Sequence, residues 1–355
     1  MAQAPEFIET IVISTRIRLA RNFAAYPFPQ TMNDEHAEDI VYLVGSELNK
    51  LDVFDRYDIA KLDKQEAAAL QEQYLISPAL MKSKRGAAFV SSDKAISIMV
   101  NEEDHLREQY IYKGFDLYKA YERISGIDEG LASAFDFAFD EKLGYLTACP
   151  SNLGTGMRAS VMMFLPGLSW NGELKKFLPT LKAGGLTVRG AFGEGTSSEG
   201  YLYQVSNERT LGVSEQEILA QMVRMTMTLC DLEIRAREEM LKSAESEIRD
   251  RCLRSYGILT NCAILSMQEF LAKIADVKLG LILGFFKARD KKGFDEFLDA
   301  MKPVAFKKSN GLENENESTC DEVRAETVCN ALPELVRVSR NVRRKSERVR
   351  RTEDK

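Results

Sequence analysis

Five arginines are the residues of this sequence with the clearest chemical potential. They stand beside small residues at expected turns or strand edges: Arg16, Arg18, Arg107, Arg158 and Arg189. Arg16 and Arg18 are two residues apart in STRIR, so an extended strand would place both on one face. A guanidinium can grip phosphate oxygens with two parallel hydrogen bonds. Singly, each arginine is an ordinary surface charge; if they converge, they form a polyphosphate site.

The glycines near these arginines favour a particular way of holding phosphate. The sequence has no Gly-x-x-x-x-Gly-Lys-Ser/Thr motif, so a P-loop does not supply the phosphate contacts. Its glycine runs are GTG at 154–156 and GAFGEG at 190–195. They would allow close backbone approach and loop movement instead.

Acids and a thiol accompany the arginines. The run NEEDH spans 101–105, and Glu194 stands between two glycines in a stretch that could close over a ligand. Cys149 lies in TACPSNLGTGMR, directly before the turn that leads to Arg158. The simpler alternatives are a solvated acidic turn and a buried structural cysteine. Paired carboxylates could instead fix a guanidinium and accept its proton.

Composition bounds the class of protein. The chain has 355 residues, 45% of them apolar, and a formal net charge of −6. This balance argues against non-specific nucleic-acid binding by the whole protein. The N-terminus lacks the pattern of a secretory signal, and the apolar run at 279–286 is too short to cross a bilayer, so we expect a cytoplasmic protein. Six scattered cysteines and two histidines favour neither a zinc site nor a Ser-His-Asp triad.

The element pattern indicates two domains. Strands are expected in 10–20 and 94–101, and a helix in 63–75. Ser214 and Glu217 form a capping box that opens a long amphipathic helix. From about Ala236 onward the chain is expected to be almost wholly helical, because it shows no strand signals. We therefore predict a catalytic domain over 1–245 and an all-α domain over 246–355.

The predicted second domain contains two strongly charged segments. Residues 311–326 carry six acids and one base, which predicts an exposed linker. The last 22 residues, 334–355, carry nine Lys/Arg against four Asp/Glu. They could form a solvated terminal helix or an anion-binding face for phosphate groups or nucleic acid.

The quoted motifs resemble those of the ATP:guanidino phosphotransferases. The resemblance is carried, in order, by STRIRLARN, SIMVNEEDHLR, GYLTACPSNLGTGMR, VRGAFGEGTSSEG and VSNERTLG, over roughly residues 12–245. It implies an α+β fold, with a phosphagen-kinase-like antiparallel sheet flanked by helices. The motifs begin at Ser14 without the family's helical N-terminal domain, and a C-terminal extension follows. This arrangement is similar to the bacterial protein-arginine kinase branch.

The resemblance also assigns roles to residues. Glu103 would be the base, Glu194 the second substrate-binding acid, and Cys149 a thiolate that orients the guanidinium without forming a covalent intermediate. Tyr74 stands where the family usually has a histidine that packs on adenine. ATP, with Mg²⁺ held mostly by its phosphates and water, would contact Ser14, Thr15, Arg16, Ile17, Arg18, Tyr74, Arg107, Arg158, Ala159, Ser160, Val161, Met162, Arg189, Gly190, Ala191, Phe192, Gly193 and Glu194.

The implied function is phosphorylation of arginine side chains in proteins, as a mark for regulated degradation or in a stress response. The alternatives are a kinase for free arginine or another small guanidino compound, and a non-catalytic phosphoarginine reader. In this branch a C-terminal Arg-Asp-x-x-Arg-Ala element binds phosphoarginine. Its nearest match here is Arg340, Asn341, Arg343 and Arg344, and Asn341 in place of the acid predicts a weakened allosteric site. The implied partners are substrate proteins such as a heat-shock repressor, a zinc-binding activator, a Clp protease and a second copy of the chain.

Overall fold

The computed structural model describes residues 6–190 and 199–339. The chain divides into two compact units. The first comprises Met1–Leu165, Gly172–Thr196 and Leu202–Leu232, and the second Pro166–Asn171, Ser197–Tyr201 and Glu233–Lys355. Within the described ranges no helix is both long enough and apolar enough to cross a membrane.

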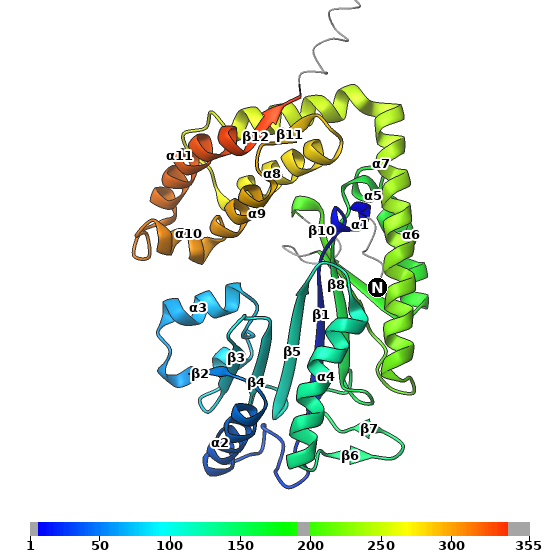
Figure 1. The fold of residues 1–355 in the computed structure, drawn as a ribbon, viewed down its shortest axis with the longest axis vertical. Coiled ribbons are helices and arrows are strands. Elements are labelled where there is room, and N and C mark those ends of the chain that lie inside the picture. Colours follow the sequence, from blue (N-terminus) through cyan, green and yellow to red (C-terminus); the bar gives the residue numbers. More distant parts are fainter. Residues whose placement is uncertain (1–5, 191–198, 340–355) are drawn as a thin grey trace, which may run out of the picture. The chain divides into compact units, whose positions relative to one another are not determined.

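An eight-stranded antiparallel sheet forms the centre of the first unit. Its strand order is β2-β3-β4-β5-β1-β8-β10-β9 (Figure 1). The bounds are β1 Val12–Arg21, β2 Phe54–Asp58, β3 Ala87–Ser91, β4 Ile96–Val100, β5 Leu106–Lys113, β8 Met157–Phe164, β9 Leu186–Gly190 and β10 Leu202–Asn207. A separate short hairpin joins β6 Phe139–Asp140 to β7 Gly144–Tyr145. The expected strands in 10–20 and 94–101 are thus confirmed as β1 and β4.

Helices of the first unit pack against both faces of this sheet. They are α1 Glu6–Glu9, α2 Asp34–Leu51, α3 Lys64–Glu72, α4 Leu117–Ala134, α6 Glu173–Ala183 and the first part of α7 Glu215–Leu259. Helix α4 packs on β1 and β5, and α6 packs on β9 (Figure 1). Ile124 and Leu131 of α4 are buried, as are Ile17 and Leu19 of β1. This apolar layer fixes which face of β1 is left for polar side chains.

Local sequence signals determine where the helices begin. Asn33 caps α2 by accepting a hydrogen bond from the amide of His36, and Asp116 caps α4 by accepting one from Lys119. The predicted Ser214–Glu217 capping box is confirmed: the Ser214 amide donates to Glu217 at 2.8 Å, and the Glu217 amide donates to Ser214 Oγ at 3.2 Å. Helix α7 then runs for 45 residues, with non-helical dihedrals at Ala244.

The second unit is mainly helical, with one short sheet that the sequence analysis did not anticipate. Its remaining helices are α5 Pro166–Trp170, α8 Met267–Ile282, α9 Lys291–Ala300, α10 Pro303–Ser309 and α11 Glu317–Leu335. The expectation of an almost wholly helical region is confirmed, but the expected absence of strands is wrong, because β11 Phe286–Ala288 pairs with β12 Val336–Val338. The two strands lie 50 residues apart in the sequence, so neither has a local partner that would reveal it.

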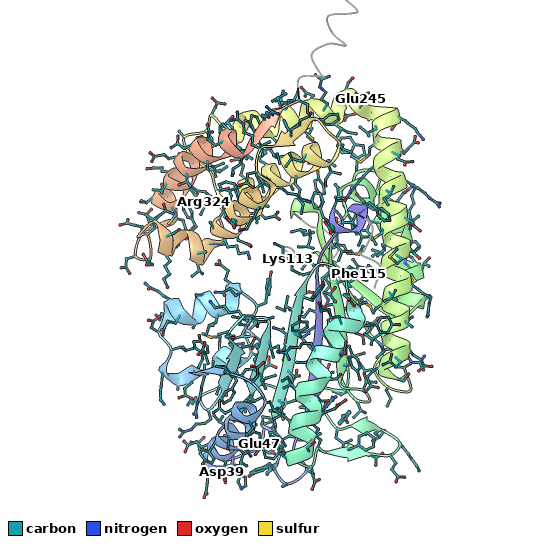
Figure 2. The ribbon with its side chains drawn as sticks, viewed as in Figure 1. Asp39, Glu47, Lys113, Phe115, Glu245 and Arg324 are labelled. Atoms are coloured by element: carbon teal, nitrogen blue, oxygen red, sulfur yellow. The ribbon has the colours of Figure 1, made fainter. Side chains whose placement is uncertain are left out.

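The expected acidic linker over 311–326 is also wrong. Helix α11 begins at Glu317, and Asn316 caps it by accepting a hydrogen bond from the amide of Thr319. Cys320, Arg324 and Val328 recur every four residues and are buried, while the acids occupy the rest of the helix surface. Arg324 lies inside the second unit, where Nη1 donates to the carbonyl of Leu265 at 2.8 Å (Figure 2). Counting charges concealed this buried stripe.

Candidate active site

The five arginines converge on one face of the sheet. Arg18 on β1 lies opposite Arg158 on β8, and residues opposite one another in antiparallel strands share a face. On its other side Arg18 lies opposite Gln109 of β5, which places Arg107, two residues earlier, on the same face. Gln204 of β10 lies opposite both Met162 and Arg189, so Arg189 joins the set. We call this surface the arginine face.

The arginine face carries uncompensated positive charge. Burial, followed by the charges of Arg107 and Arg158, lowers the pKa of Arg16 to about 10. Burial and the neighbouring guanidinium groups also lower the pKa of Arg18 well below its usual range, and they lower that of Arg158. The Nε atoms of Arg18 and Arg158 are buried without a hydrogen-bond partner among the described residues. Such groups favour an external anion with several acceptor oxygens.

Arg16 and Arg107 form hydrogen bonds with side chains of the described residues. Arg16 Nη2 donates to the neutral Gln204 Oε1 at 3.0 Å. Arg107 Nη1 donates to both carboxylate oxygens of Glu102, at 2.7 and 3.1 Å. The side chain of Glu102 is only 2% exposed, and it also accepts a hydrogen bond from Ser77 Oγ. Glu102 therefore neutralises part of the positive charge of the arginine face. The sequence did not predict this role, because it depends on the contact between the Glu102 and Arg107 side chains.

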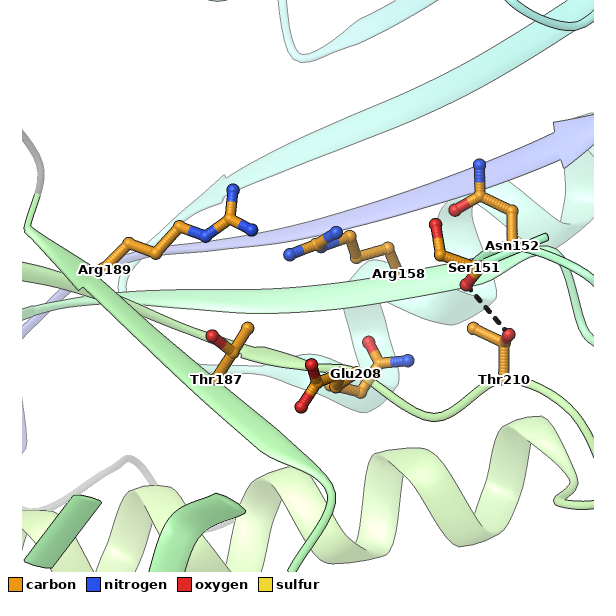
Figure 3. Close-up of a pocket in the computed structure, with 8 residues that line it drawn as sticks. Ser151, Asn152, Arg158, Thr187, Arg189, Glu208 and Thr210 are labelled. Carbon is orange, nitrogen blue, oxygen red and sulfur yellow. Dashed lines mark hydrogen bonds between the residues drawn. The ribbon is translucent and has the colours of Figure 1, made fainter. Parts of the chain in front are cut away.

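A pocket opens beside Arg158 and Arg189. The guanidinium groups of these two residues point toward one another above β8 and β9 (Figure 3). The lining also includes Ser151, Asn152, Thr187, Asn207, Glu208 and Thr210. Thr210 Oγ1 contacts the carbonyl of Ser151 at 3.0 Å (Figure 3) and that of Leu153 at 2.8 Å, and so braces the loop. Apart from Arg158 and Arg189, these residues were not predicted as site residues, although three lie in the motif VSNERTLG.

The loop that carries Cys149 lies next to this pocket. Cys149 is a free, half-buried thiol, and its Sγ lies 3.1 Å from Ser151 Oγ. Cys149 is among the groups that influence the pKa of Arg158, so the thiol lies close to the arginine face. Gly154 and Gly156 have positive φ angles of 109° and 63°. A Cβ at Gly154 would lie 2.3 Å from the carbonyl oxygen of Thr210, so the close approach requires glycine.

The acidic turn at 101–105 presents its three acids differently. Glu103 is exposed, and its carbonyl accepts a hydrogen bond from Gln30 at 2.8 Å. Glu102 and Asp104 are held inside. Burial raises the pKa of Asp104, against the opposing effect of hydrogen bonds from Ala148 and Asn22. Glu103 is therefore the acid of this turn that is open to an incoming substrate.

The other predicted site residues fall into four groups. Ser14, Ser160 and Met162 share the arginine face, whereas the side chains of Thr15, Ile17, Ala159 and Val161 alternate to the opposite face, leaving only their main chain for a ligand. Tyr74 is 51% exposed and close enough to affect the charge of Arg16, and Gly190 ends β9. Outside the described residues lie Ala191, Phe192, Gly193, Glu194, Arg340, Asn341, Arg343 and Arg344.

Comparison with known proteins identifies the class to which this sheet and site belong. Residues 36–236 match the model described as ATP:guanido phosphotransferase, C-terminal catalytic domain. Residues 245–344 match the model of the protein-arginine kinase McsB C-terminal domain. The chain therefore belongs to the ATP:guanido phosphotransferase family, as the sequence motifs led us to expect.

Individual relatives place the chain within that family. It is 39% identical over 333 residues to a protein-arginine kinase of Caldanaerobacter subterraneus subsp. tengcongensis, covering 92% of this chain and 98% of the relative. It is 43% identical over 293 residues to one of Clostridium acetobutylicum, covering 81% and 86%. The substrate-free duplicated taurocyamine kinase of Schistosoma mansoni shares the fold, with a TM-score of 0.60 and 24% identity over 74% of this chain and 41% of that one. The chain groups with the protein-arginine kinases.

Proposed function

We propose that this protein transfers the γ-phosphoryl group of ATP to arginine side chains of other proteins. The observation that carries the proposal is the arginine face, with its unpartnered Nε atoms on Arg18 and Arg158, beside Cys149 and the acidic turn. Family membership and the names of the curated relatives support the same reaction.

The arginine face supplies the charge that phosphoryl transfer requires. Such a reaction depends mainly on in-line alignment and on neutralising the phosphate oxygens, with little covalent help from the protein. Five guanidinium groups on β5, β1, β8 and β9 would hold the phosphates at several points, and β-strands position them rigidly. Mg²⁺ would accompany the nucleotide, held by phosphate oxygens and water, and would neutralise further charge.

The acceptor must be deprotonated as it reacts. An arginine guanidinium stays protonated at neutral pH, so it has no lone pair for attack on phosphorus. Glu103 would accept the proton as the N–P bond forms and the bond from the γ-phosphorus to the bridging oxygen of ADP breaks. The thiolate of Cys149, beside the Ser151 hydroxyl, would orient the attacking nitrogen by charge. Glu194 is proposed as the second substrate-binding acid.

A direct test compares two glutamates of this chain. Wild type, Glu103→Gln and the control Glu141→Gln, an exposed glutamate next to the β6–β7 hairpin, are incubated with ATP, Mg²⁺ and a basic protein. Phosphoarginine is scored by mass spectrometry without acid treatment. We expect product from wild type and Glu141→Gln and almost none from Glu103→Gln. Absence of product from wild type would refute the activity, and full product from Glu103→Gln would refute the base.

The same assay with free arginine in place of protein tests the substrate class. We expect protein to be phosphorylated well and free arginine poorly, and efficient turnover of the free amino acid would instead define a small-molecule kinase. A cytoplasmic location, a role in degradation or stress response, homodimer formation, and binding to a zinc-binding activator and a Clp protease remain predictions from the sequence resemblance.

A further inference from the structure

Asp104 connects the acidic turn to the loop that carries Cys149. Its Oδ1 accepts one hydrogen bond from the amide of Ala148 and another from Asn22 Nδ2, each at 2.7 Å. Asn22 Nδ2 also donates to the carbonyl of Leu146 at 3.0 Å, while its Oδ1 accepts from the amide of His105 at 2.8 Å. Two buried side chains therefore fasten one segment to the other.

The acidic turn is itself rigidly built. Asn101 has a positive φ of 58°, and its amide donates to the carbonyl of His105 at 3.0 Å. Asn101 Nδ2 donates to the carbonyl of Ala37 at 2.9 Å. The ring of His105 lies between the amide of Phe23, which donates to Nδ1 at 3.0 Å, and the carbonyl of Pro27. A displacement of Asp104 therefore moves the turn as one piece.

The hydrogen bond between Ala148 and Asp104 joins residues that are direct neighbours of two proposed reactive groups. Asp104 directly follows Glu103, and Ala148 directly precedes Cys149. Consecutive Cα atoms are about 3.8 Å apart, so the bond from Ala148 to Asp104 lies one residue from each reactive group. Hydrogen bonds to a carboxylate are about twice as strong as those between neutral groups, and 2.7 Å is a length typical of them.

We propose that Asp104 is a positioning residue that holds the Glu103 carboxylate and the Cys149 thiol in register for the same guanidinium. This inference rests on the proposed function, because Glu103 and Cys149 must both act on the substrate. Asp104 itself touches neither ATP nor the acceptor. Two charged neighbours also influence the pKa of Asp104: Glu102 on the acidic turn raises it, and Arg107 at the start of β5 lowers it.

The chain offers a matched control in Asp93. Asp93 braces the turn at the other end of β4, where its Oδ1 accepts from Ser91 Oγ at 2.6 Å and from the amide of Ala95 at 3.0 Å. It thus makes the same two kinds of contact as Asp104 but lies next to neither Glu103 nor Cys149. Asp104→Ala and Asp93→Ala should each destabilise the turn that the aspartate braces, whereas only Asp104→Ala should lower kcat.

The experiment measures kcat, KM for ATP, the alkylation rate of Cys149 by iodoacetamide and the thermal unfolding of each variant. For Asp104→Ala we expect kcat to fall about 10- to 100-fold, because small misplacements of reacting groups have effects of this size. KM for ATP should stay within about twofold, since the arginines belong to the strands. The Cys149 alkylation rate should change several-fold. Asp104→Asn, which keeps Oδ1, should recover most of the lost kcat, and Asp93→Ala should leave kcat and alkylation at wild-type values.

Several outcomes would overturn the inference. One is an Asp104→Ala variant whose kcat and alkylation rate match those of Asp93→Ala, and another is a parallel rise in KM for ATP. If Asp104→Ala does not fold, Asn22→Ala must show the same fall in kcat at unchanged KM, and failure to do so overturns the inference. Full activity of Glu103→Gln would remove both the proposed base and the role of Asp104. An inactive Glu103→Gln beside a fully active Asp104→Ala would remove only the latter.

Discussion

Each face of strand β1 buries an arginine, but the charged surroundings of the two arginines differ. On one face Arg18 is surrounded by other guanidinium groups, which together with burial lower its pKa. On the other face the Arg21 side chain is 3% exposed and forms a two-pronged ion pair with Asp128, at 3.0 and 2.8 Å, which raises its pKa. Arg21 also lies over the ring of Tyr145, 3.6 Å from its centroid. A single strand thus presents a compensated and an uncompensated arginine three residues apart.

The difference separates a structural charge from one that is kept available. Burying a cation is costly unless the chain supplies an anion, and Asp128 on α4 supplies one for Arg21. For Arg18 and Arg158, no carboxylate among the described residues makes an ion pair. Their charge is instead available to phosphate, so the fold tolerates repulsion at this face in order to bind a polyanion.

The largest effect on stability is expected from Arg21→Met. Removing the cation leaves Asp128 buried beside the fully buried Glu108, whose pKa is already raised well above its usual value by burial and by Asp128. We expect a loss of about 3–5 kcal/mol in the free energy of unfolding, measured by denaturant titration. The control Arg56→Met removes an exposed pair with Asp58 and should change stability by less than about 1 kcal/mol. A loss below about 1 kcal/mol for Arg21→Met would show that the Arg21–Asp128 ion pair does not stabilise the fold.

Arg158→Met should show the opposite pattern. The variant removes a guanidinium from the arginine face, so we expect the rate of arginine phosphorylation to fall about 10²- to 10³-fold. Stability should stay the same or rise, because repulsion from Arg189 and Arg107 is relieved. Steady-state kinetics and thermal unfolding on the same preparation check both halves. Activity near that of wild type would contradict the role assigned to this face.

His105 offers a third way to bury a base, namely to keep it neutral. Burial lowers its pKa to about 4 from an ordinary value near 6.5. The unfolded chain therefore takes up a proton in the window between pH 6.5 and 4 while the folded chain does not. Stability should fall by up to about 3 kcal/mol as the pH drops through this window. Denaturant titrations at several pH values should show a shallower dependence for His105→Gln, and an identical slope would exclude His105 as the cause.

The smallest effect is expected from anion binding itself. Pyrophosphate at 100 times its Kd should raise the free energy of unfolding of the wild type by about 2.7 kcal/mol. The gain should shrink as salt is added, and it should be smaller in Arg16→Met at the same pyrophosphate concentration. Arg21 lies on the opposite face, so a conservative Arg21→Lys variant should keep the gain. Equal stabilisation of wild type and Arg16→Met would show that pyrophosphate binds elsewhere.

The sequence revealed those parts of the fold and site that depend on local pattern. The spacing of Arg16 and Arg18 predicted a shared face, the Ser214–Glu217 pair predicted the start of α7, and family motifs predicted which distant arginines would join them. The sequence did not reveal contacts that depend on the exact course of the chain. The pairing of Glu102 with Arg107 depends on the conformation of the acidic turn, and the bond from Ala148 to Asp104 joins segments that are far apart in the sequence. Helix α11 was missed because its many acids obscured a narrow buried stripe.

The most direct test measures binding and folding together in Arg18→Met. ATP with Mg²⁺ is titrated calorimetrically into wild type and variant at one salt concentration, and both are unfolded thermally without nucleotide. If the charge of Arg18 is kept for phosphate, ATP affinity should fall at least about tenfold while the variant unfolds at no lower temperature than the wild type. Unchanged ATP affinity, or a stability loss as large as that of Arg21→Met, would contradict the claim that the charge of Arg18 is kept for phosphate.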